Sequence, residues 1–351
     1  MHAPGSRPLT FAIIGAGLIG PRHAHTVALN HDTELIAVVD PSPSGKELAE
    51  SLGTSYHESV SSLVQSQKPD GAIICTPNHT HVALAQELAS AGVHILIEKP
   101  VSTDLETGKD LLQHLEDTSI KVLVGHHRRF NPYMVTAKKM LSEGKLGDVI
   151  AVNGLWATHK PLEYFAPPCD WRRASSAGVI LINMIHEVDL LQFLFGPIER
   201  VYAEKTKPQR PYEADEGAAM TLRFKSGIVG TFVASDVTPS QHNFESGTGE
   251  NPLIPKSGHD FYRILGTDGT LSVPDMSVSS HTSGEKTWHQ PLSREQFPVP
   301  EGVPFELQLA HFVRVIRDEE ASLCTVSDGL SALAVCIAIK ESLESGKPIT
   351  I

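Results

Sequence analysis

A glycine motif near the start of the chain has the spacing of a phosphate-binding loop. It has the form Gly15-x-Gly17-x-x-Gly20, follows an apolar run that predicts a strand, and opens a helical pattern. The first glycine allows a tight turn, the second lets the backbone approach a pyrophosphate, and the third lets helix and strand pack closely. The helix N-terminus then faces the phosphates. We expect the loop to bind a dinucleotide through Gly15, Gly17, Leu18, Ile19 and Gly20; the alternative is a purely structural turn.

An acidic residue follows this loop where a ribose contact would be needed. The apolar run 34–40 predicts a buried strand, and Asp40 ends it. A carboxylate there can accept hydrogen bonds from the 2′- and 3′-hydroxyls of an adenosine ribose, but it would repel a 2′-phosphate. Residues 41–44 contain no arginine that could neutralise such a phosphate. NAD is therefore favoured over NADP.

A lysine stands at the end of another predicted strand. The run 94–98 leads directly into Lys99 and Pro100, and lysine is seldom buried without a partner. Most such lysines reach solvent. This one falls on the sheet edge where the dinucleotide is expected, and desolvation or a neighbouring cation there would lower its pKa, as proton transfer requires.

A histidine in an apolar helical segment is a second candidate for proton transfer. Within residues 178–195, helical spacing places Asn183, His186 and Leu190 on one stripe, and Asp189 follows the histidine by one turn. A neutral histidine beside a carboxylate has a defined tautomer and can exchange a proton with a substrate hydroxyl. The alternative is a core histidine that is hydrogen-bonded within an amphipathic helix.

Two arginine pairs could bind an oxygen-rich ligand. Arg128 and Arg129 are adjacent, as are Arg172 and Arg173, and an arginine can hold a carboxylate through two hydrogen bonds. Any one of them could equally be a solvated surface charge. Trp171 could stack on a sugar or cyclitol ring, or pack between domains. The histidine pair at 126–127 lacks the spacing of a metal site, so no metal is expected.

The first part of the chain alternates short apolar runs with helical patterns. Strands are predicted at 10–14, 34–40, 71–75, 94–98 and 121–125, with helices between them. This alternation predicts βαβ units and a parallel sheet, whose ligands bind at the carboxyl ends of the strands. We therefore expect an N-terminal Rossmann dinucleotide-binding domain over residues 1–128.

After about residue 145 most strands follow one another without helices. Predicted strands at 148–157, 198–206, 218–224, 227–235, 261–266, 270–273 and 277–280 indicate a second, largely antiparallel sheet. Residues 241–259 are typical of a long loop, and two helices, near 305–318 and 328–345, close the chain. The fold class is α/β, with a substrate-binding and oligomerisation domain over residues 129–351 whose final helices could pack back on the first domain.

The composition excludes several classes of protein. The 351 residues carry a formal net charge of −12, which argues against nucleic-acid and anionic-membrane partners. The apolar runs are far shorter than the roughly 20 residues of a membrane span, and the first residues contain no apolar signal segment. Four cysteines without a paired spacing indicate neither zinc nor redox chemistry. We expect a reduced, cytoplasmic protein.

Together, the motifs resemble those of the Gfo/Idh/MocA oxidoreductases, which include glucose–fructose oxidoreductase and inositol dehydrogenase. The resemblance covers nearly the whole chain and implies a Rossmann domain followed by an α/β domain with a large, mostly antiparallel, open-faced sheet. It also implies a homodimer or homotetramer assembled through that sheet. The motifs that carry the resemblance are Gly15-x-Gly17-x-x-Gly20, Cys75-Thr-Pro-Asn78-His-Thr-His81, Glu98-Lys99-Pro100, Arg128-Arg129-Phe130, Trp171-Arg172 and His186-x-x-Asp189.

The resemblance further implies a set of site residues. Lys99 and His186 would be catalytic, and a segment around Lys99 and Pro100 that could be cis would lie against the nicotinamide. The other cofactor contacts would be Thr76, Pro77, Asn78, His81, Glu98 and Arg129. The substrate contacts would be Arg129, Trp171, Arg172 and Asn183.

One position departs from the family pattern. Many relatives have an aspartate four residues before the histidine, where this chain has Ile182. Ile182 cannot carry a proton. Asn183, about 100° further round a helix, can hydrogen-bond to a substrate but cannot act as an acid or base. The proton-transfer set is thus reduced to Lys99 and His186, and the case for inositol as substrate is weakened.

The sequence therefore predicts an NAD-dependent oxidoreductase that acts on a secondary alcohol or ketone of a polyhydroxylated small molecule, such as a sugar, polyol or cyclitol. A weaker similarity to quinate-utilisation oxidoreductases would suit a quinate-like acid. Two alternatives stay open. One is a redox-neutral hydrolase or lyase with tightly bound, transiently reduced NAD, and the other is a non-catalytic NAD-binding regulator.

Overall fold

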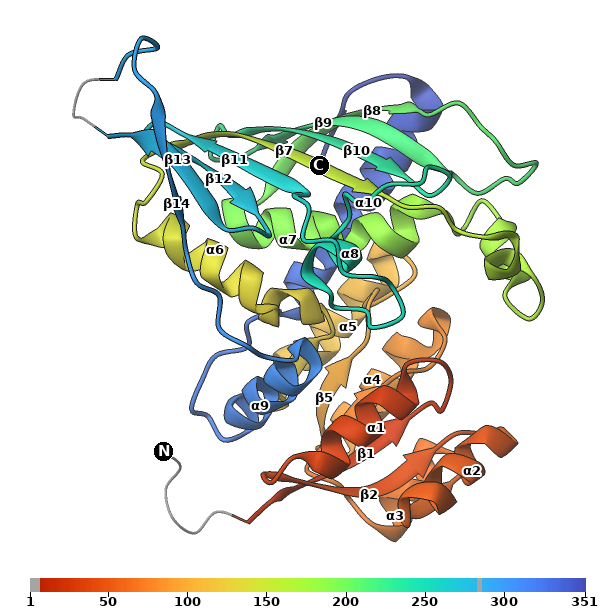
Figure 1. Ribbon diagram of the computed structural model, residues 1–351. Coiled ribbons are helices and arrows are strands. Elements are labelled where there is room, and N and C mark those ends of the chain that lie inside the picture. The colour runs from red at the N-terminus through yellow and green to blue at the C-terminus, as the bar shows by residue number, and fades with distance from the viewer. Residues whose placement is uncertain (1–6, 283–285) are drawn as a thin grey trace. The chain divides into compact units, whose positions relative to one another are not determined.

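The computed structural model describes residues 7–282 and 286–351, and the chain divides into two compact units (Figure 1). The chain leaves the first unit after Phe130, returns to it at Val303, and leaves it again after Leu330. The second unit therefore comprises residues 131–302 and 331–351. Each unit has its own hydrophobic core.

The first unit is built on a six-stranded parallel sheet in the order β3-β2-β1-β4-β5-β6. This order confirms the predicted Rossmann domain, and it reverses direction between β1 and β4, where dinucleotides bind in such sheets. The strands are β1 (Leu9–Ile14), β2 (Thr33–Val39), β3 (Ser55–His57), β4 (Gly71–Ile74), β5 (His94–Ile97) and β6 (Val122–Val124).

Helices cover this sheet, which explains why its central strands are mostly apolar. Every residue of β4 is buried, as is all of β5 except its first residue, because parallel strands face helices on both sides. The ring of Phe11 in β1 lies 5.9 Å from that of Phe312, so α9 packs on the strand that the glycine loop follows. The helices of this unit are α1 (Gly20–Leu29), α2 (Pro43–Leu52), α3 (Val60–Ser66), α4 (His81–Ser90), α5 (Leu105–Glu116) and α9 (Pro304–Ile316).

The second unit contains a nine-stranded sheet in the order β14-β13-β12-β11-β7-β10-β9-β8-β15. Among the described residues of this sheet, only β7 and β10 pair in parallel, so it is mostly antiparallel, as predicted. The strands are β7 (Val149–Ala157), β8 (Ile198–Lys205), β9 (Gly217–Phe224), β10 (Val229–Ser235), β11 (Tyr262–Gly266), β12 (Gly269–Val273), β13 (Ser277–His281), β14 (Leu292–Gln296) and β15 (Ile349–Thr350). The sequence pattern did not predict β14 or β15.

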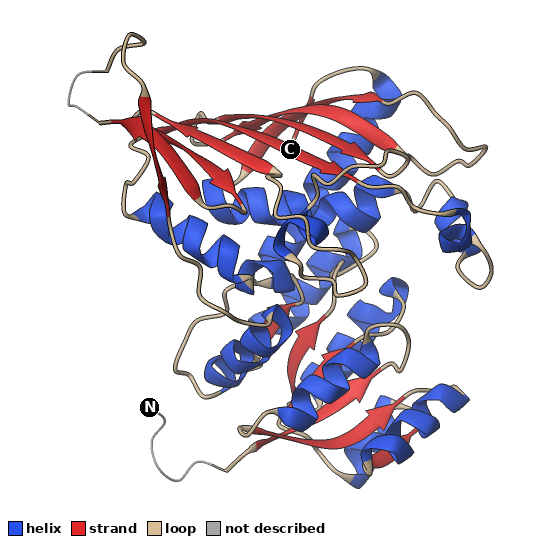
Figure 2. Ribbon diagram, in the orientation of Figure 1, coloured by secondary structure: helices blue, strands red, loops and turns tan. Residues whose placement is uncertain are grey.

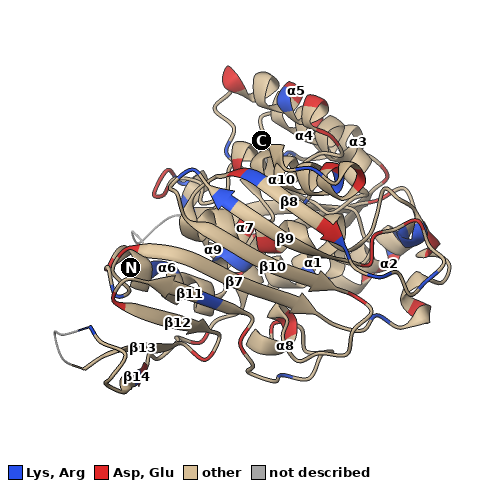
Figure 3. Cartoon of the chain, turned by 90° about the horizontal axis from the view of Figure 1, so that it is seen from above, with Lys and Arg blue, Asp and Glu red and all other residues tan. Residues whose placement is uncertain are grey.

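One face of this sheet is covered and the other is open. Residues alternate between buried and exposed along most of β9 and β10, the pattern of a sheet with one solvated face. Helices α6 (Pro132–Ser142), α7 (Ile185–Phe195) and the part of α10 (Val326–Ser345) after Leu330 lie along one face (Figure 2). Seen from above, the strands of the other face lie uncovered (Figure 3).

Two segments of the second unit differ from the sequence-based expectation. The predicted helix 178–195 begins with a π-helical turn, Ile180–Met184, and becomes α-helical only at Ile185. The predicted loop 241–259 contains a short helix, α8 (Phe244–Thr248), capped by the Asn243 side chain, which accepts from the Ser246 N–H. Among the described residues, no helix has the length and apolar character needed to cross a membrane.

Candidate functional site

The glycine loop follows β1 and has the geometry that a dinucleotide needs. Gly15 has a φ of +101°, and a Cβ there would stand 2.8 Å from the Cys75 carbonyl carbon, so loop and β4 approach closely. A Cβ on Gly20 would meet the Gly15 carbonyl oxygen at 2.1 Å. A Cβ on Gly17, by contrast, would have no atom within 4 Å. The motif predicts that a pyrophosphate approaches the backbone through the space that Gly17 leaves open.

The N-terminus of α1 is also suited to an anion. Its N-cap residue, Ile19, supplies no side-chain hydrogen bond, and its first turn has no acidic residue. The first N–H groups of a helix have no partner within the helix, and its dipole places partial positive charge there. Leu18, in the loop itself, is 93% exposed. The loop and helix end therefore fit a pyrophosphate group.

Asp40 lies at the carboxyl end of β2 and contacts the glycine loop. Its Oδ2 accepts a hydrogen bond from the Ala16 N–H at 2.7 Å, and its Oδ1 accepts one from the Ser42 N–H at 2.8 Å. Burial raises the pKa of Asp40, but the hydrogen bonds from Ser42 and Ala16 outweigh it, so the net pKa is lowered. The group is thus held as a carboxylate at the position from which ribose hydroxyls would be bound.

The segments that follow β4 and β5 are joined by a buried histidine. The ring nitrogens of His81 lie 2.8 Å from the Pro100 and Thr76 carbonyl oxygens, so the ring bridges both segments. Burial lowers the pKa of His81. Pro77 and Asn78 form the turn before α4, where the Thr80 hydroxyl donates to the Thr76 hydroxyl. This arrangement favours a positioning role for His81 within the expected cofactor site.

Glu98 is buried at the end of β5, directly before Lys99. His23 Nε2 lies 2.8 Å from Glu98 Oε1, and the Lys99 N–H donates to Glu98 Oε2 at 3.2 Å. Burial raises the pKa of Glu98, but the hydrogen bond from His23 and the charges of His23, His127 and Lys99 lower it to about 2 overall. The Lys99–Pro100 peptide bond is cis. Because Lys99 follows β5, it stands at the carboxyl edge of the sheet that carries the glycine loop.

Arg129 is buried in a 3-10 turn, His127–Phe130, within the first unit. Its Nη1 donates to the Leu323 carbonyl oxygen at 2.7 Å, and its Nη2 lies 3.8 Å from Asp328 Oδ1. These contacts hold the guanidinium, a group with five N–H donors, in place within the first unit. In the same turn, the His127 ring stacks on Phe305 at 4.4 Å.

The second unit carries the histidine helix. His186 is 8% exposed, and the neighbouring acids Glu187 and Asp189 are buried with it on α7. The Tyr262 hydroxyl of β11 donates to Glu187 Oε2. The apolar residues of α7 belong to the same hydrophobic core as residues of the sheet, so the helix carries its polar side chains on a well-packed element.

The predicted substrate residues of the second unit lie in unequal surroundings. Trp171 is 56% exposed in a 3-10 turn, Asp170–Arg173. Arg172 donates to the Tyr164 carbonyl oxygen at 2.9 Å and stacks over the Tyr164 ring at 3.9 Å. Its Nε is buried without a hydrogen-bond partner among the described residues. The amide oxygen of Asn183, in the π-helical turn, accepts from Lys160 Nζ at 2.6 Å.

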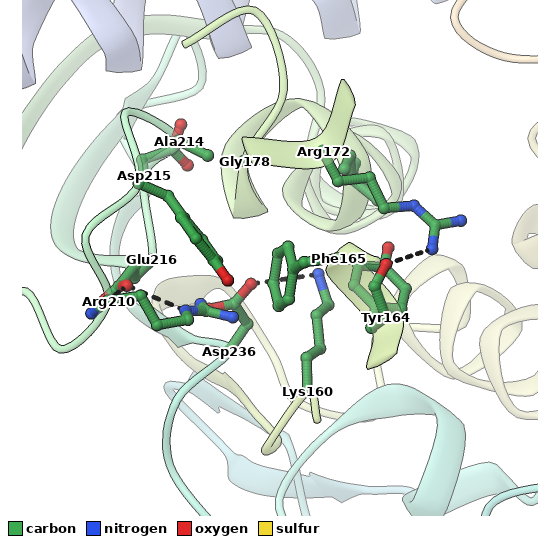
Figure 4. A pocket seen from close by; sticks show the side chains of 12 residues that line it. Lys160, Tyr164, Phe165, Arg172, Gly178, Arg210, Ala214, Asp215, Glu216 and Asp236 are labelled. Atoms are coloured by element: carbon green, nitrogen blue, oxygen red, sulfur yellow. Dashed lines mark hydrogen bonds and ion pairs between the residues drawn. The ribbon is translucent and has the colours of Figure 1, made fainter. Parts of the chain in front are cut away.

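A pocket of the second unit contains charged residues that sequence reasoning missed (Figure 4). Lys160 Nζ lies 3.3 Å from Asp236 Oδ2, and Arg210 donates to both Asp236 and Glu216. The side chains of Lys160 and Arg210 are each only 9% exposed. Lys160 follows the predicted strand 148–157, which resembles the placement of Lys99 and could have drawn attention to it. Nothing in the sequence indicated its distant partner Asp236.

Models of two protein domains match the chain. The NAD-binding Rossmann fold of an oxidoreductase family matches residues 9–126, and the C-terminal alpha/beta domain of that family matches residues 138–351. Inositol 2-dehydrogenase of Rhizobium meliloti is 26% identical over 97% of this chain and 98% of its own length. The scyllo-inositol 2-dehydrogenase (NAD(+)) of Bacillus subtilis is also 26% identical, over 97% of this chain and 95% of its own.

Solved structures share the fold at lower identity. The WlbA dehydrogenase from Bordetella pertussis, in complex with NADH and UDP-GlcNAcA, superposes with a TM-score of 0.79 at 24% identity, over 98% of this chain and 99% of its own. An oxidoreductase from Agrobacterium radiobacter, in complex with NAD+, L-tartaric acid and magnesium, superposes with a TM-score of 0.81 at 16% identity. The match covers 97% of this chain and 98% of that one. Among the described residues of this chain, no group of three or more His, Cys, Asp or Glu side chains could hold a metal ion.

Proposed function

Because this chain belongs to the Gfo/Idh/MocA oxidoreductase family and is a dehydrogenase with an NAD-binding Rossmann domain, we propose that it acts on a secondary alcohol or ketone of a polyhydroxylated small molecule. Bound NAD supplies the hydride acceptor, or NADH the donor. The substrate class is a sugar, polyol, cyclitol or quinate-like acid. The relatives named for inositol support the polyol class.

The observation that carries this proposal is the common position of two features in the first unit. The glycine loop follows β1, and Lys99 follows β5, at the carboxyl edge of the same parallel sheet. Gly15, Gly17, Leu18, Ile19 and Gly20 hold the pyrophosphate, Asp40 binds the adenosine ribose, and Thr76, Pro77 and Asn78 line the same edge. Glu98 and His81 position the segment that contains Lys99.

Proton transfer falls to Lys99 and His186. The Lys99 ammonium, or its neutral amine, exchanges a proton with the substrate hydroxyl, and His186 is held on α7 as a second proton carrier. Arg129, Trp171, Arg172 and Asn183 bind the substrate. Arginine and asparagine suit hydroxyl and carboxylate oxygens, and the indole of Trp171 suits the apolar face of a sugar or cyclitol ring.

The experiment that tests the proposal is a substrate screen on the purified protein. NAD or NADP is supplied as the cofactor, and sugars, polyols, cyclitols, quinate and shikimate are tested as substrates by the absorbance of the reduced cofactor. Each substrate that is turned over is then tested with Lys99→Ala and His186→Ala. We expect turnover with NAD that both substitutions abolish. An absence of turnover, with NAD(H) retained through purification, would overturn the proposal and favour redox-neutral or regulatory chemistry.

The open face of the sheet in the second unit suits a second copy of the chain. Ile150, Val229, Val233 and Leu265 are apolar and 57%, 45%, 41% and 40% exposed. An uncovered sheet of this kind is commonly buried in a symmetric assembly. We expect light scattering to give the mass of a dimer or tetramer, and Val229→Glu with Val233→Glu to dissociate it; a monomeric wild type would contradict this.

A further inference from the structure

The site described so far leaves one buried lysine without a role. Lys160 stands just beyond β7, and its backbone N–H donates to the Asp236 carbonyl oxygen at 2.9 Å. Its side chain is 9% exposed, and Nζ lies 4.8 Å from the Tyr164 ring centroid. Burying an ammonium group is costly unless partners satisfy it. A residue kept at such a position therefore calls for an explanation.

The partners of Lys160 are a carboxylate and an amide. Its Nζ lies 3.3 Å from Asp236 Oδ2 and 2.6 Å from Asn183 Oδ1. Arg210 also binds Asp236, so two cations share that carboxylate (Figure 4). Since Arg210 also pairs with Glu216 at 2.9 Å, the cluster is electrically balanced. The bond from Lys160 to Asn183 is thus an interaction beyond what neutralising Asp236 requires.

This bond fixes the orientation of the Asn183 amide. An ammonium group only donates hydrogen bonds, so the group that faces it must be the amide oxygen. The amide nitrogen then points the other way. It has no hydrogen-bond partner among the described residues, and it is not among their buried unpartnered atoms. Asn183 therefore offers two N–H donors at an accessible position.

The backbone supports the same arrangement. Asn183 lies in the π-helical turn Ile180–Met184, whose start is held by Asp215: its Oδ2 accepts from the Ile180 N–H at 2.8 Å. Single π-helical turns are rare and often occur at functional sites. Ile182, in the same turn, lines the pocket with Lys160 but has no polar atom to offer. Asn183 is the residue of this turn that can bind a substrate oxygen.

We propose that Lys160 is a positioning residue for the substrate site: held by Asp236, it turns the Asn183 amide so that its N–H groups bind an acceptor oxygen of the substrate. This rests on the proposed function and narrows the substrate class. A hydroxyl oxygen can also accept these hydrogen bonds, but a carboxylate oxygen is charged, so it binds N–H donors more strongly. Burial also lowers the pKa of Lys160, yet its contacts with Asp236 and Asn183 are those of a donor. The preferred substrate is therefore a polyol that bears a carboxylate.

Three variants test this, with quinate as the carboxylate probe and myo-inositol as the neutral one. Lys160→Met removes the donor while keeping the length of the side chain. Asn183→Asp keeps an acceptor for Lys160 but removes the N–H donors. Lys138→Met is the matched control, because the Lys138 ammonium is also a partly buried donor in the second unit: it lies 2.6 Å from the Phe193 carbonyl oxygen, near the end of α7 that is remote from the π-helical turn. Steady-state kinetics with NAD and crystal structures of all four proteins are compared.

We expect Lys160→Met and Asn183→Asp each to raise KM for quinate about 10- to 100-fold, with a smaller change for myo-inositol. Lys138→Met should change KM less than threefold. In crystals of Lys160→Met, the Asn183 amide should rotate or lose its single position. The inference is overturned if Asn183→Asp binds quinate as well as the wild type does, or if the amide of Lys160→Met stays in place.

These measurements distinguish a failure of the proposed function from a failure of the role proposed for Lys160. If the wild type turns over neither probe nor any other polyol with NAD, the proposed function fails, while the crystal structures still decide how Lys160 holds Asn183. If the wild type oxidises substrates but Lys160→Met matches Lys138→Met in kcat and KM, the proposed function stands and the role of Lys160 is overturned.

Discussion

His23 Nε2 lies 2.8 Å from Glu98 Oε1, and the two side chains are 3% and 9% exposed. The other oxygen of Glu98 accepts the N–H of Lys99. One end of this contact is thus on α1, the helix that follows the glycine loop, and the other is beside the lysine proposed to move a proton. The pair therefore connects α1 to the proposed proton carrier through two buried side chains.

This pair makes the stability of the first unit sensitive to acid. The pKa of Glu98 is about 2 in the folded chain against 4.5 in its ordinary state. Because the folded pKa is the lower one, its stabilisation is complete above pH 4.5 and is lost as pH falls toward 2. When the pH is lowered from about 6 to about 3, the unfolding free energy of both proteins should fall. We expect the fall to be about 2 kcal/mol smaller in Glu98→Gln than in the wild type.

Urea titrations followed by far-UV circular dichroism measure this difference. Tryptophan fluorescence would not serve, because Trp156, Trp171 and Trp288 all belong to the second unit. Glu47→Gln is the control, since Glu47 is exposed on α2; it should keep the wild-type dependence on pH. Equal acid sensitivity in wild type and Glu98→Gln would show that the buried carboxylate does not carry this effect.

Two glycines of the loop should respond in opposite ways to alanine. A Cβ on Gly17 meets nothing within 4 Å, whereas one on Gly20 meets the Gly15 carbonyl oxygen at 2.1 Å. Gly17→Ala should therefore keep its thermal stability but raise the Kd for NAD at least about tenfold, because the methyl group occupies the path of the pyrophosphate. Gly20→Ala should instead cost about 1–3 kcal/mol of unfolding free energy.

Calorimetry gives both quantities for these two variants. If Gly17→Ala binds NAD with the wild-type Kd, the loop does not hold the pyrophosphate in the proposed way. If Gly20→Ala is as stable as the wild type, the loop has room that the structure does not show.

We expect Asp40 to determine the preference for NAD over NADP. Its carboxylate is held beside the glycine loop by the N–H groups of Ala16 and Ser42, where we propose that the ribose hydroxyls bind. Asp40→Ala should lower the ratio of kcat/KM for NAD to that for NADP at least about tenfold, because hydrogen bonds to charged groups contribute about 1.5–3 kcal/mol. Glu34→Ala, an exposed change at the opposite end of β2, should leave the ratio unchanged; an unchanged ratio in Asp40→Ala would refute the ribose contact.

Much of the first unit could be predicted from the sequence because its determinants are local. The glycine spacing, the apolar runs and the acid after β2 each lie within a short stretch of chain, and right-handed βαβ connections leave few ways to assemble them. Even there, the short strand β3 and helix α3 escaped the pattern. Three residues in β3 are too few to show a period.

The features of the second unit that the sequence did not predict depend on contacts between distant parts of the chain. The pair of Lys160 and Asp236 joins the ends of β7 and β10, which are neighbours only because those strands pair in parallel. The π-helical turn at Ile180–Met184 adds no residue type that a helical pattern would exclude, so the segment was predicted to be α-helical throughout. Asn183 was expected to contact substrate, but its orientation depends on the lysine that the sequence did not connect to it.

Lys99 should not tolerate replacement by arginine if it moves a proton. Arginine stays protonated in proteins, so it could hold a substrate oxygen by its charge but could not accept a proton from a hydroxyl. We expect Lys99→Arg and Lys99→Met to lower kcat by a similar factor, at least about 100-fold. His186→Asn should lower kcat with the Kd for NAD unchanged, because the residues proposed to bind NAD belong to the first unit and His186 to the second. Single-turnover kinetics across pH separate the roles: a Lys99→Arg variant that retains most of its kcat would mean that Lys99 only orients the substrate, and His186 would then be left as the sole proton carrier proposed.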